Sequence, residues 1–347
     1  MPAFVSTPVV AYTTTAAWIA APAIGPKDFA WLEVVRADGD TRVVAGFRGD
    51  RLVVRTGGRN STIVDQPCTT QPCGTVQGPV ASGDGSFAYA VAFPGTGGYV
   101  ATVTAGGLSA IVAEDQTDPR EIAEPHPVTA GGGAVVWVDN GQILSAPAAG
   151  GTATTLVTAE QAGGTITSLA AGPAGVAWSA RGTAGGTLVG VRAPSGEVSV
   201  RATEPDTAAA TLYSVALADD GTVLAMRRTL AKGRQTVTLT AFAPDGTNRP
   251  LVASVPFGKR DPFEVTRPAV AGTRAAVRLR GGPGGSRDEL WVVDLASGKR
   301  QRVTAVERSD GRLTDPAFGA GRLVWAKDDL AGSRLVRARV YSAAVRP

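Results

Sequence analysis

The sequence predicts an all-β fold, a seven-bladed β-propeller built from four-stranded antiparallel blades. One pattern of short apolar runs separated by Gly-containing turns recurs about seven times, at a period of roughly 40–50 residues. The composition agrees, with 44 Gly, 23 Pro and 44% hydrophobic residues in 347 and without long helical periodicity. Each repeat opens at a proline or a serine: Pro8, Pro79, Pro127, Ser168, Ser214, Pro268 and Pro316.

The first hairpin of each repeat supplies its first two strands, as in SGDGSFAYAV (82–91) and AGPAGVAWSA (171–180). Gly or Asp-Gly in the turn provides the positive φ that tight hairpins require. An aromatic residue recurs on the predicted second strand, and its regularity indicates packing between neighbouring blades rather than a ligand-binding cage. These aromatic residues are Trp18, Tyr89, Trp137, Trp178 and Trp325. A second hairpin, such as APSGEVSVRA (193–202), supplies the third and fourth strands.

The seventh repeat lacks a fourth strand, because it runs through RLVRARVYS (334–342) without a further Gly turn. An open ring would leave unpaired strand edges, which native proteins manage explicitly. The strand-like segment PAFVST (2–7) precedes the first repeat, and we expect it to supply the missing outer strand of blade seven. The two ends of the chain would then pair, and truncation of either end should destabilise the whole ring.

We expect residues 1–347 to form a single propeller domain with an insertion at about 46–78. Within this segment RLVVR and STIVD have the pattern of a hairpin. A blade needs four apolar runs and this segment has two, so an insertion is favoured. A degenerate eighth blade is the alternative.

Two cysteines, Cys68 and Cys73 in CTTQPC, lie in the same segment. A metal or redox site is one interpretation, but zinc would need two further ligands and the chain has a single His. The spacing also differs from that of a redox C-x-x-C pair, so a local Cys68–Cys73 disulfide is the favoured interpretation. A disulfide indicates an oxidising compartment, and we therefore expect an extracytoplasmic protein: secreted, periplasmic or in the cell envelope.

The uncharged stretch from Met1 to Pro26 lacks the basic region of a signal peptide, and threonines 13–15 interrupt it. We expect it to form strands, and whether a signal peptide has been removed stays open. The sequence holds no run of 18 apolar residues free of polar interruption, so we expect no membrane-spanning segment.

The segment DELWVVDLASGKRQRVTA (288–305) is typical of a known repeat, as are Pro268 and Pro316 and the hairpins SGDGSFAYA and ADDGTVLA. Together they resemble the TolB-like (PD40, WD40-like) propeller repeat, which reads roughly P-x-x-S-P-D-G-x-x-I-A-F and then I-Y-V-x-D-x-x-G-G-x-x-x-x-L-T. The resemblance covers most of the chain, but only repeats two and five carry the Asp-Gly hairpin. The TolB N-terminal α/β domain has no counterpart here. The resemblance implies the propeller fold and an envelope or periplasmic binding role, without shared catalytic residues.

The functional residues are expected on the face that carries the blade-to-blade linkers and the loops between second and third strands, by analogy with other propellers. In the last repeats these loops are charged. Residues 226–347 hold 23 Lys and Arg against 11 Asp and Glu, whereas residues 1–225 hold 11 against 19, so one sector should be basic. The candidate binding residues are Arg228, Lys232, Arg234, Arg280, Arg287, Arg267, Asp315, Tyr213 and His126.

Three function hypotheses follow. The first is a non-enzymatic exported binding or scaffold protein that engages a protein or an anionic glycan through this face. The second is a channel-mouth lyase or glycoside hydrolase that uses Asp315, Arg267, Tyr213 and His126, and the third is a self-associating subunit of an envelope complex. We expect no nucleic-acid partner, because the basic residues lack aromatic interleaving. We also expect no metal or cofactor, since the chain has one His, and it has no G-x-S-x-G motif.

Overall fold

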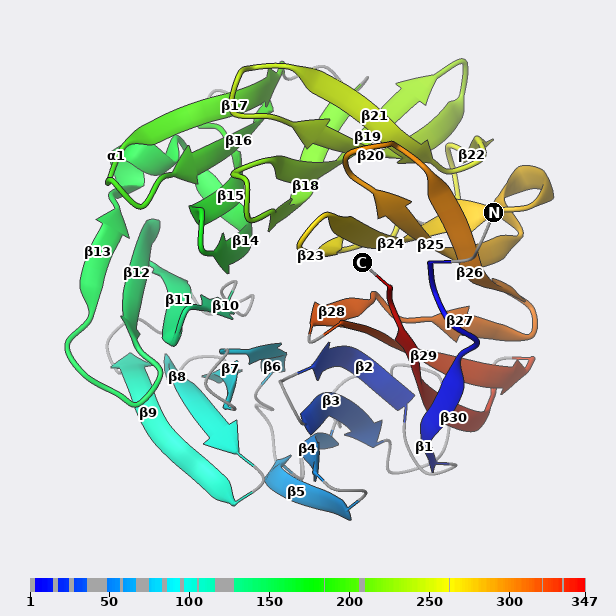
Figure 1. Ribbon diagram of the computed structural model, residues 1–347, viewed down its shortest axis with the longest axis horizontal. Helices are drawn as coiled ribbons and strands as arrows, with labels where there is room; N and C mark the ends of the chain where they lie inside the picture. Colours follow the sequence, from blue (N-terminus) through cyan, green and yellow to red (C-terminus); the bar gives the residue numbers. More distant parts are fainter. Residues whose placement is uncertain are drawn as a thin grey trace.

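Seven antiparallel sheets surround a central axis in the computed structural model of this protein (Figure 1). The structure describes residues 4–14, 18–24, 28–35, 49–56, 59–66, 75–82, 86–93, 97–104, 106–115, 128–183, 185–205, 210–261, 263–319, 321–332 and 334–346. The strands of these residues confirm the predicted seven-bladed β-propeller, with seven blades rather than eight.

The blades follow chain order, and each begins at its inner strand (Figure 1). Blade one comprises β2 (Trp18–Ile24), β3 (Asp28–Val35), β4 (Gly49–Thr56) and β5 (Arg59–Gln66); blade two comprises β6 (Thr75–Ala81), β7 (Phe87–Phe93), β8 (Gly97–Thr104) and β9 (Gly107–Asp115). Blade three comprises β10 (Val128–Gly131), β11 (Ala134–Asp139), β12 (Gln142–Pro147) and β13 (Thr154–Val157); blade four comprises β14 (Thr165–Gly172), β15 (Gly175–Arg181), β16 (Thr187–Arg192) and β17 (Val198–Glu204).

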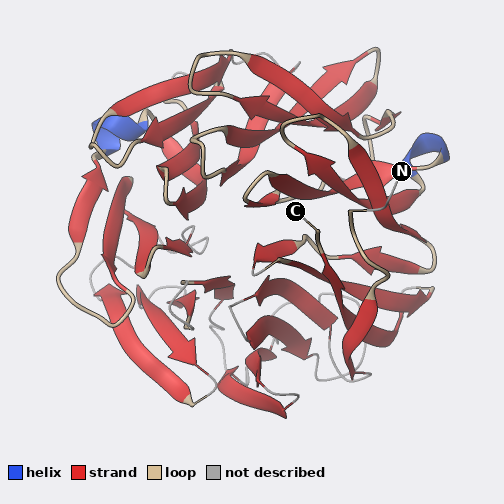
Figure 2. Cartoon of the chain, viewed as in Figure 1, coloured by secondary structure: helices blue, strands red, loops and turns tan. Residues whose placement is uncertain are grey.

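Blades five and seven each carry one additional short strand, whereas blade six has four strands. Blade five comprises β18 (Ala210–Leu217), β19 (Val223–Ala231), β20 (Arg234–Phe242) and β21 (Asn248–Ala253), and β22 (Phe257–Gly258) also pairs with β20; blade six comprises β23 (Ala269–Ala271), β24 (Arg274–Gly281), β25 (Arg287–Asp294) and β26 (Arg300–Glu307). Blade seven comprises β27 (Gly311–Leu313), β28 (Ala317–Gly319), β29 (Arg322–Ala331), β30 (Arg334–Ala344) and β1 (Val9–Thr14). Among the described residues, helix is limited to α1 (Ala159–Ala162) and a 3-10 turn (Pro283–Gly285) (Figure 2).

The core is divided among the interfaces between adjacent blades. In blades two, three, four and seven the second strand contributes a large buried aromatic side chain that packs against the preceding blade. These side chains are the predicted Tyr89, Trp137, Trp178 and Trp325. In blade one this position belongs to Trp31 on β3, which packs against blade seven. The prediction for Trp18 was wrong, because this residue begins the inner strand β2.

Blade one starts one strand later than the sequence pattern suggested. The hairpin predicted as an insertion at about 46–78 is present, but it forms β4 and β5, the outer half of this blade. The physical reason is burial: Leu52 and Val54 of β4 lie in the core between blades one and two, and β4 pairs with β3 from Asp28↔Thr56 to Val35↔Gly49. The insertion is therefore corrected to a pair of blade strands.

The N-terminal part of the chain completes blade seven, which confirms the predicted closure of the ring. The strand that pairs with β30 is β1, Val9–Thr14, rather than the predicted segment 2–7. The residues before β1 continue along the same edge: Val5 forms a bridge with Val345, and Phe4 O accepts a 2.9 Å hydrogen bond from the backbone N of Arg346.

The same N-terminal segment contacts both neighbours of blade seven. In blade six, Gln301 Oε1 accepts hydrogen bonds from the backbone N atoms of Phe4 (2.9 Å) and Val5 (3.1 Å). In blade one, the Tyr12 ring lies 4.7 Å from the Trp31 ring, centroid to centroid. Residues 4–14 therefore tie three blades together at the point where the ring closes.

One glycine is fixed by the buried aromatic side chain of blade four. Gly190 on β16 lies opposite Trp178 on β15, and a Cβ at this position would overlap the indole ring. The indole ring of Trp178 cannot shift to make room for a Cβ, because it is fully buried and its Nε1 donates a 3.1 Å hydrogen bond to Ala162 O. We expect Gly190→Ala to lower the free energy of unfolding by about 3 kcal/mol, measured by urea denaturation.

Gly172 on β14 offers a matched control, because the nearest atom to a Cβ there is Leu217 O at 3.7 Å. We expect Gly172→Ala to stay within about 0.5 kcal/mol of the unmodified protein. Equal losses for the two alanine variants would show that the indole ring does not fix residue 190.

The seam between blades seven and one contains a buried carboxylate. Asp328 on β29 is 6% exposed, and its Oδ1 accepts a hydrogen bond of 3.4 Å from the backbone N of Ile19. Burial raises the pKa of Asp328 from 3.8 to about 7, and the nearby charge of Asp329 acts in the same direction, while the Ile19 N–H and Arg312 oppose it. The native state therefore retains a proton at a pH where the unfolded chain has released it.

This proton makes stability depend on pH with a defined sign. The native state binds more protons than the unfolded chain between pH 3.8 and 7, so the contribution is fully present below pH 3.8 and is lost as the pH rises through 7. We expect Asp328→Asn to match the unmodified protein near pH 4 and to exceed its unfolding free energy by about 4 kcal/mol at pH 8.

The adjacent residue is the control for this prediction. Burial would raise the pKa of Asp329, but hydrogen bonds from Lys327 and Arg337 and the charges of Lys327 and Arg339 lower it. Asp329→Asn should therefore weaken the protein near neutral pH instead of strengthening it. A gain in stability for both variants at pH 8 would contradict the assignment to Asp328.

Candidate functional site

The linkers and the loops between second and third strands lie on one face in blades five and six, as predicted. The linker from blade five to six meets the β19–β20 turn, where Lys259 N donates a 3.0 Å hydrogen bond to Gly233 O. The linker from blade six to seven meets the β24–β25 loop, where Arg308 N donates to Ser286 O at 2.9 Å. We call this surface the loop face.

An ionic cluster joins blades six and seven to these linkers. Its centre is Arg278 on β24, whose side chain is 11% exposed. Arg278 Nη1 lies 2.8 Å from Glu264 Oε2 and 3.7 Å from Asp288 Oδ2, and its Nε lies 3.1 Å from Asp315 Oδ1. The complete cluster comprises Glu264, Arg278, Arg280, Asp288, Arg308 and Asp315.

Asp288 is the most deeply buried member, with a side chain 1% exposed. Its Oδ1 lies 2.6 Å from Arg308 Nη1, and its Oδ2 accepts a 3.3 Å hydrogen bond from the backbone N of Leu313. Arg308 Nη2 also bonds to Glu264. Removal of charges from water is costly unless they are paired, and here each carboxylate meets a guanidinium.

For Glu264 and Arg278 the pairing outweighs burial, as the direction of each pKa shift indicates. Burial would raise the pKa of Glu264, but hydrogen bonds from Arg308 and Arg278 lower it to about 2. Burial likewise opposes the charge of Arg278, but Asp315, Asp288 and Glu264 together raise its pKa. Three guanidinium groups therefore face three carboxylates.

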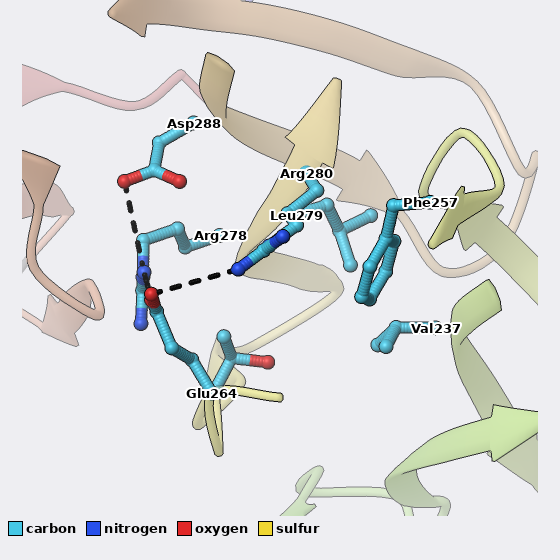
Figure 3. Close-up of a pocket in the computed structure, with 8 residues that line it drawn as sticks. Val237, Phe257, Glu264, Arg278, Leu279, Arg280 and Asp288 are labelled. Carbon is cyan, nitrogen blue, oxygen red and sulfur yellow. Dashed lines mark hydrogen bonds and ion pairs between the residues drawn. The ribbon is translucent and has the colours of Figure 1, made fainter. Parts of the chain in front are cut away.

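A small cavity adjoins this cluster (Figure 3). Its volume is about 20 Å³, room for about one water molecule. Phe257, Val237 and Leu279 form its apolar wall, and the side chains of Arg278, Arg280, Glu264 and Asp288 converge on the opposite side (Figure 3). Thr266 completes the lining. A cavity of this size does not admit a saccharide unit.

The cluster is better suited to holding blades together than to acid–base chemistry. A glycoside hydrolase needs one carboxylic acid with a raised pKa, and Glu264 is shifted in the opposite direction. Asp315, a candidate of the enzyme hypothesis, has both oxygens engaged: Oδ1 by Arg278 Nε and Oδ2 by the backbone N of Arg267 at 3.0 Å. Neither carboxylate is poised to donate a proton.

The structure brings together three of the candidate residues, Tyr213, Arg267 and Asp315. The Tyr213 hydroxyl lies 3.4 Å from Thr266 Oγ1, next to Arg267 in the chain. Tyr213 is 7% exposed and packs edge-on against Phe263 at 5.0 Å. Tyr213 therefore belongs to the buried core between blades five and six, and this burial raises the pKa of its phenol.

Three other candidates are held by internal contacts. Arg280 lies over the Phe257 ring at 4.6 Å, and Arg287 Nε is 3.2 Å from Glu307 Oε1. Arg228 lies over the Phe263 ring at 4.7 Å, and its Nε donates to Gln235 Oε1 at 2.9 Å. These arginines were predicted as docking residues, and their side chains stabilise the loops.

Lys232 and Arg234 remain exposed on the β19–β20 hairpin. The linker places two further exposed cations beside them, Lys259 and Arg260, which the sequence analysis did not identify. We call these four residues the blade-five platform. Their proximity has no local sequence signal, because it depends on the linker folding back onto the hairpin.

The ionic cluster was also not predicted from the sequence, although one of its contacts could have been. Arg280 lies opposite Asp288 in the β24–β25 hairpin, and the register around a short loop can be anticipated. Glu264 reaches the cluster from the linker between blades five and six, Arg308 from the linker between blades six and seven, and Asp315 from the segment between β27 and β28. Strand periodicity does not predict these contacts.

His126, Cys68 and Cys73 lie outside the described residues. In the part of the chain that the structure describes, there is no group of three or more His, Cys, Asp or Glu residues arranged to hold a metal ion. Within the same residues, no helix has the length and apolar character needed to cross a membrane.

Comparison with known proteins supports the fold alone. No family model and no curated protein matches the sequence. Among solved structures, the β-propeller domain of the Trilobed protease from Pyrococcus furiosus, described as having an open velcro topology, is similar at 9% identity with a TM-score of 0.55. That match covers 94% of this chain and 93% of the other.

Two further solved structures have the same architecture. The Pyrococcus horikoshii acylaminoacyl peptidase matches at 9% identity and a TM-score of 0.53 over 90% of this chain, which spans about half of that protein (49%). The WD40 domain of Toxoplasma gondii coronin matches at 11% identity and a TM-score of 0.51, covering 99% of this chain and 89% of that one. These likenesses support the β-propeller fold and leave the TolB-like resemblance as a prediction.

Proposed function

We propose that this chain is a non-catalytic binding propeller that engages an anionic partner, a protein or a glycan, through the loop face of its basic sector. The observation that carries the proposal is the contrast between two sets of charges. The carboxylates of the ionic cluster are neutralised by arginines, whereas the four cations of the blade-five platform are exposed. Unneutralised surface charge of one sign attracts partners of the opposite sign.

The proposal is tested by retention of the purified protein on immobilised heparin and on immobilised polyglutamate. We expect retention on at least one of them, with elution as the ionic strength rises, because exposed charges interact over about 10 Å at 0.1 M salt. A variant carrying Lys232→Glu and Arg234→Glu should elute earlier. Passage through both columns at low salt would refute the proposal.

A matched control separates the platform from general positive charge. Lys299 and Arg300 are exposed at the β25–β26 hairpin, away from the loop face, and their reversal to Glu changes the net charge equally. We expect this control variant to be retained like the unmodified protein. Equal losses in the two variants would show that only total charge matters.

An extracytoplasmic location completes the proposal and rests on the sequence CTTQPC. We expect peptide mapping without reductant to recover Cys68 and Cys73 in linked form, and reductant to release them. Free thiols in protein isolated from its native compartment would argue for a reducing location.

A further inference from the structure

We infer that the blade-five platform, formed by Lys232, Arg234, Lys259 and Arg260, is a docking site for an acidic polypeptide segment of a protein partner. The inference rests on the proposed function and deepens it, because it names the site and the chemical class of the partner. Its basis is the way the linker between blades five and six is fixed against the β19–β20 hairpin.

Two contacts bring the four cations together. The backbone N of Lys259 donates to Gly233 O at 3.0 Å, and Arg234 Nη2 donates to Pro256 O at 3.0 Å. Lys232 stands at the tip of the hairpin with φ +49°, in the left-handed region. The turn and the linker are thus side by side, although more than twenty residues separate them in the chain.

The backbone beneath the platform is held rigidly. Gln235 is fully buried, and its Nε2 donates to the carbonyl oxygens of Gly258 (2.8 Å) and Asp261 (2.9 Å). Phe257 is 2% exposed and packs under Arg280, while its Cβ faces Gly285 so closely that a Cβ there would collide with it. A preorganised site loses less conformational entropy on binding, which favours affinity.

The platform carries positive charge without a matching carboxylate. Among the described residues, no salt bridge joins a carboxylate to any of the four platform cations, whereas the nearby Arg280 and Arg287 each pair with a glutamate. Asp261 is the acidic residue next to Arg260, and its Oδ2 is directed inward to accept a 2.8 Å hydrogen bond from Gly258 N. The positive potential therefore faces solvent.

The surroundings favour a polypeptide over a saccharide. Saccharide-sized ligands bind in concave sites lined by aromatic side chains. None of the exposed large apolar side chains in the described part of the chain is aromatic, and the cavity beside the cluster holds about one water. The same linker instead exposes an aliphatic side chain, Val265, at 56%. Protein interfaces combine such apolar contacts with charged rims.

The test uses the full chain and two fluorescein-labelled probes, a short peptide of Glu, Asp and Leu and a heparin oligosaccharide. Binding is followed by fluorescence anisotropy at about 50 mM salt, where surface charges are weakly screened. We expect the peptide to bind, and the double variant Lys259→Glu with Arg260→Glu to bind it at least about tenfold more weakly. The control variant Lys299→Glu with Arg300→Glu should bind like the unmodified protein.

Each other outcome has a defined meaning. If heparin binds through the platform and the peptide does not, the partner is a glycan: the inference fails while the proposed function stands. Equal peptide affinity in all variants would place the site elsewhere and also overturn the inference. If neither probe binds, both the inference and the proposed function fail. Thermal unfolding of each variant verifies that the propeller is intact, and the exposed positions of Lys259 and Arg260 predict unchanged midpoints.

Discussion

Removal of residues 1–14 is expected to abolish the cooperative unfolding transition of this protein. The deletion takes away β1, whose pairing with β30 completes blade seven, and the Tyr12 ring that packs against Trp31 in blade one. It also frees Gln301 in blade six from its two backbone donors. Folded domains are stable by only about 5–15 kcal/mol, and the loss of contacts to three blades is of that size. Circular dichroism during heating would measure the effect.

Complementation provides the control. A synthetic peptide of residues 4–14, added to the truncated protein, should restore the transition, whereas a scrambled peptide of the same composition should not. Gln301→Ala in the full chain should cost only about 1–2 kcal/mol, because it removes side-chain hydrogen bonds and leaves β1 in place. A truncated protein that unfolds as cooperatively as the full chain would show that the ring closes without β1.

Replacement of Arg278 by Met is expected to lower the free energy of unfolding by about 5 kcal/mol. Methionine keeps an unbranched apolar side chain but leaves Asp288 with Arg308 alone and Asp315 without a guanidinium. Glu264 keeps Arg308 and the more distant Arg280. A buried charge that loses its partner retains the full penalty of leaving water. Urea denaturation at pH 7 would measure the loss.

Two comparisons make this prediction specific. Arg300→Met removes an exposed arginine of the same blade and should change stability by less than about 0.5 kcal/mol. In Arg278→Met, the additional change Asp288→Asn should cost less than the same change in the unmodified protein, because the residues share one network. A loss below about 1 kcal/mol for Arg278→Met would contradict a stabilising role of the cluster.

The cluster also predicts how stability changes in acid. The pKa of Glu264 is lowered from 4.5 to about 2, so its contribution is present above pH 4.5 and is lost as the pH falls to 2. This loss should amount to about 3 kcal/mol in the unmodified protein and should be smaller in Arg278→Met. An identical acid profile for both proteins would contradict the pairing of Glu264 with Arg278.

The architecture could be predicted from sequence because each blade repeats the same local pattern. Blades two to six, and all but the outer strand of blade seven, were placed correctly by their turns and by aromatics such as Tyr89 and Trp178. The error in blade one has a physical cause: strands within a repeat resemble one another, so a displacement of one strand gives an equally good pattern. Only the long-range pairing of β1 with β30 decides the assignment, and periodicity carries no information about it.

The candidate site was predictable in its location but not in its contacts. Loop charge indicated the loop face of blades five to seven, and the ionic cluster and the blade-five platform lie there. Composition could not distinguish arginines held by the core, such as Arg280, from exposed ones such as Lys232. Whether an arginine or lysine is paired or exposed depends on the positions of linker residues such as Glu264 and Lys259 in the folded protein. Tertiary packing determines these positions.

The pairing of β1 with β30 also has a consequence for the order of events during synthesis. Among the described strands, β1 is made first and its partner β30 last, so β1 has no partner while the six other sheets assemble. Contacts of such long sequence separation form slowly, and an unsatisfied strand edge is prone to aggregation in the meantime. Val9 and Val10, exposed even in the native ring, add apolar surface to this edge until β30 has been made.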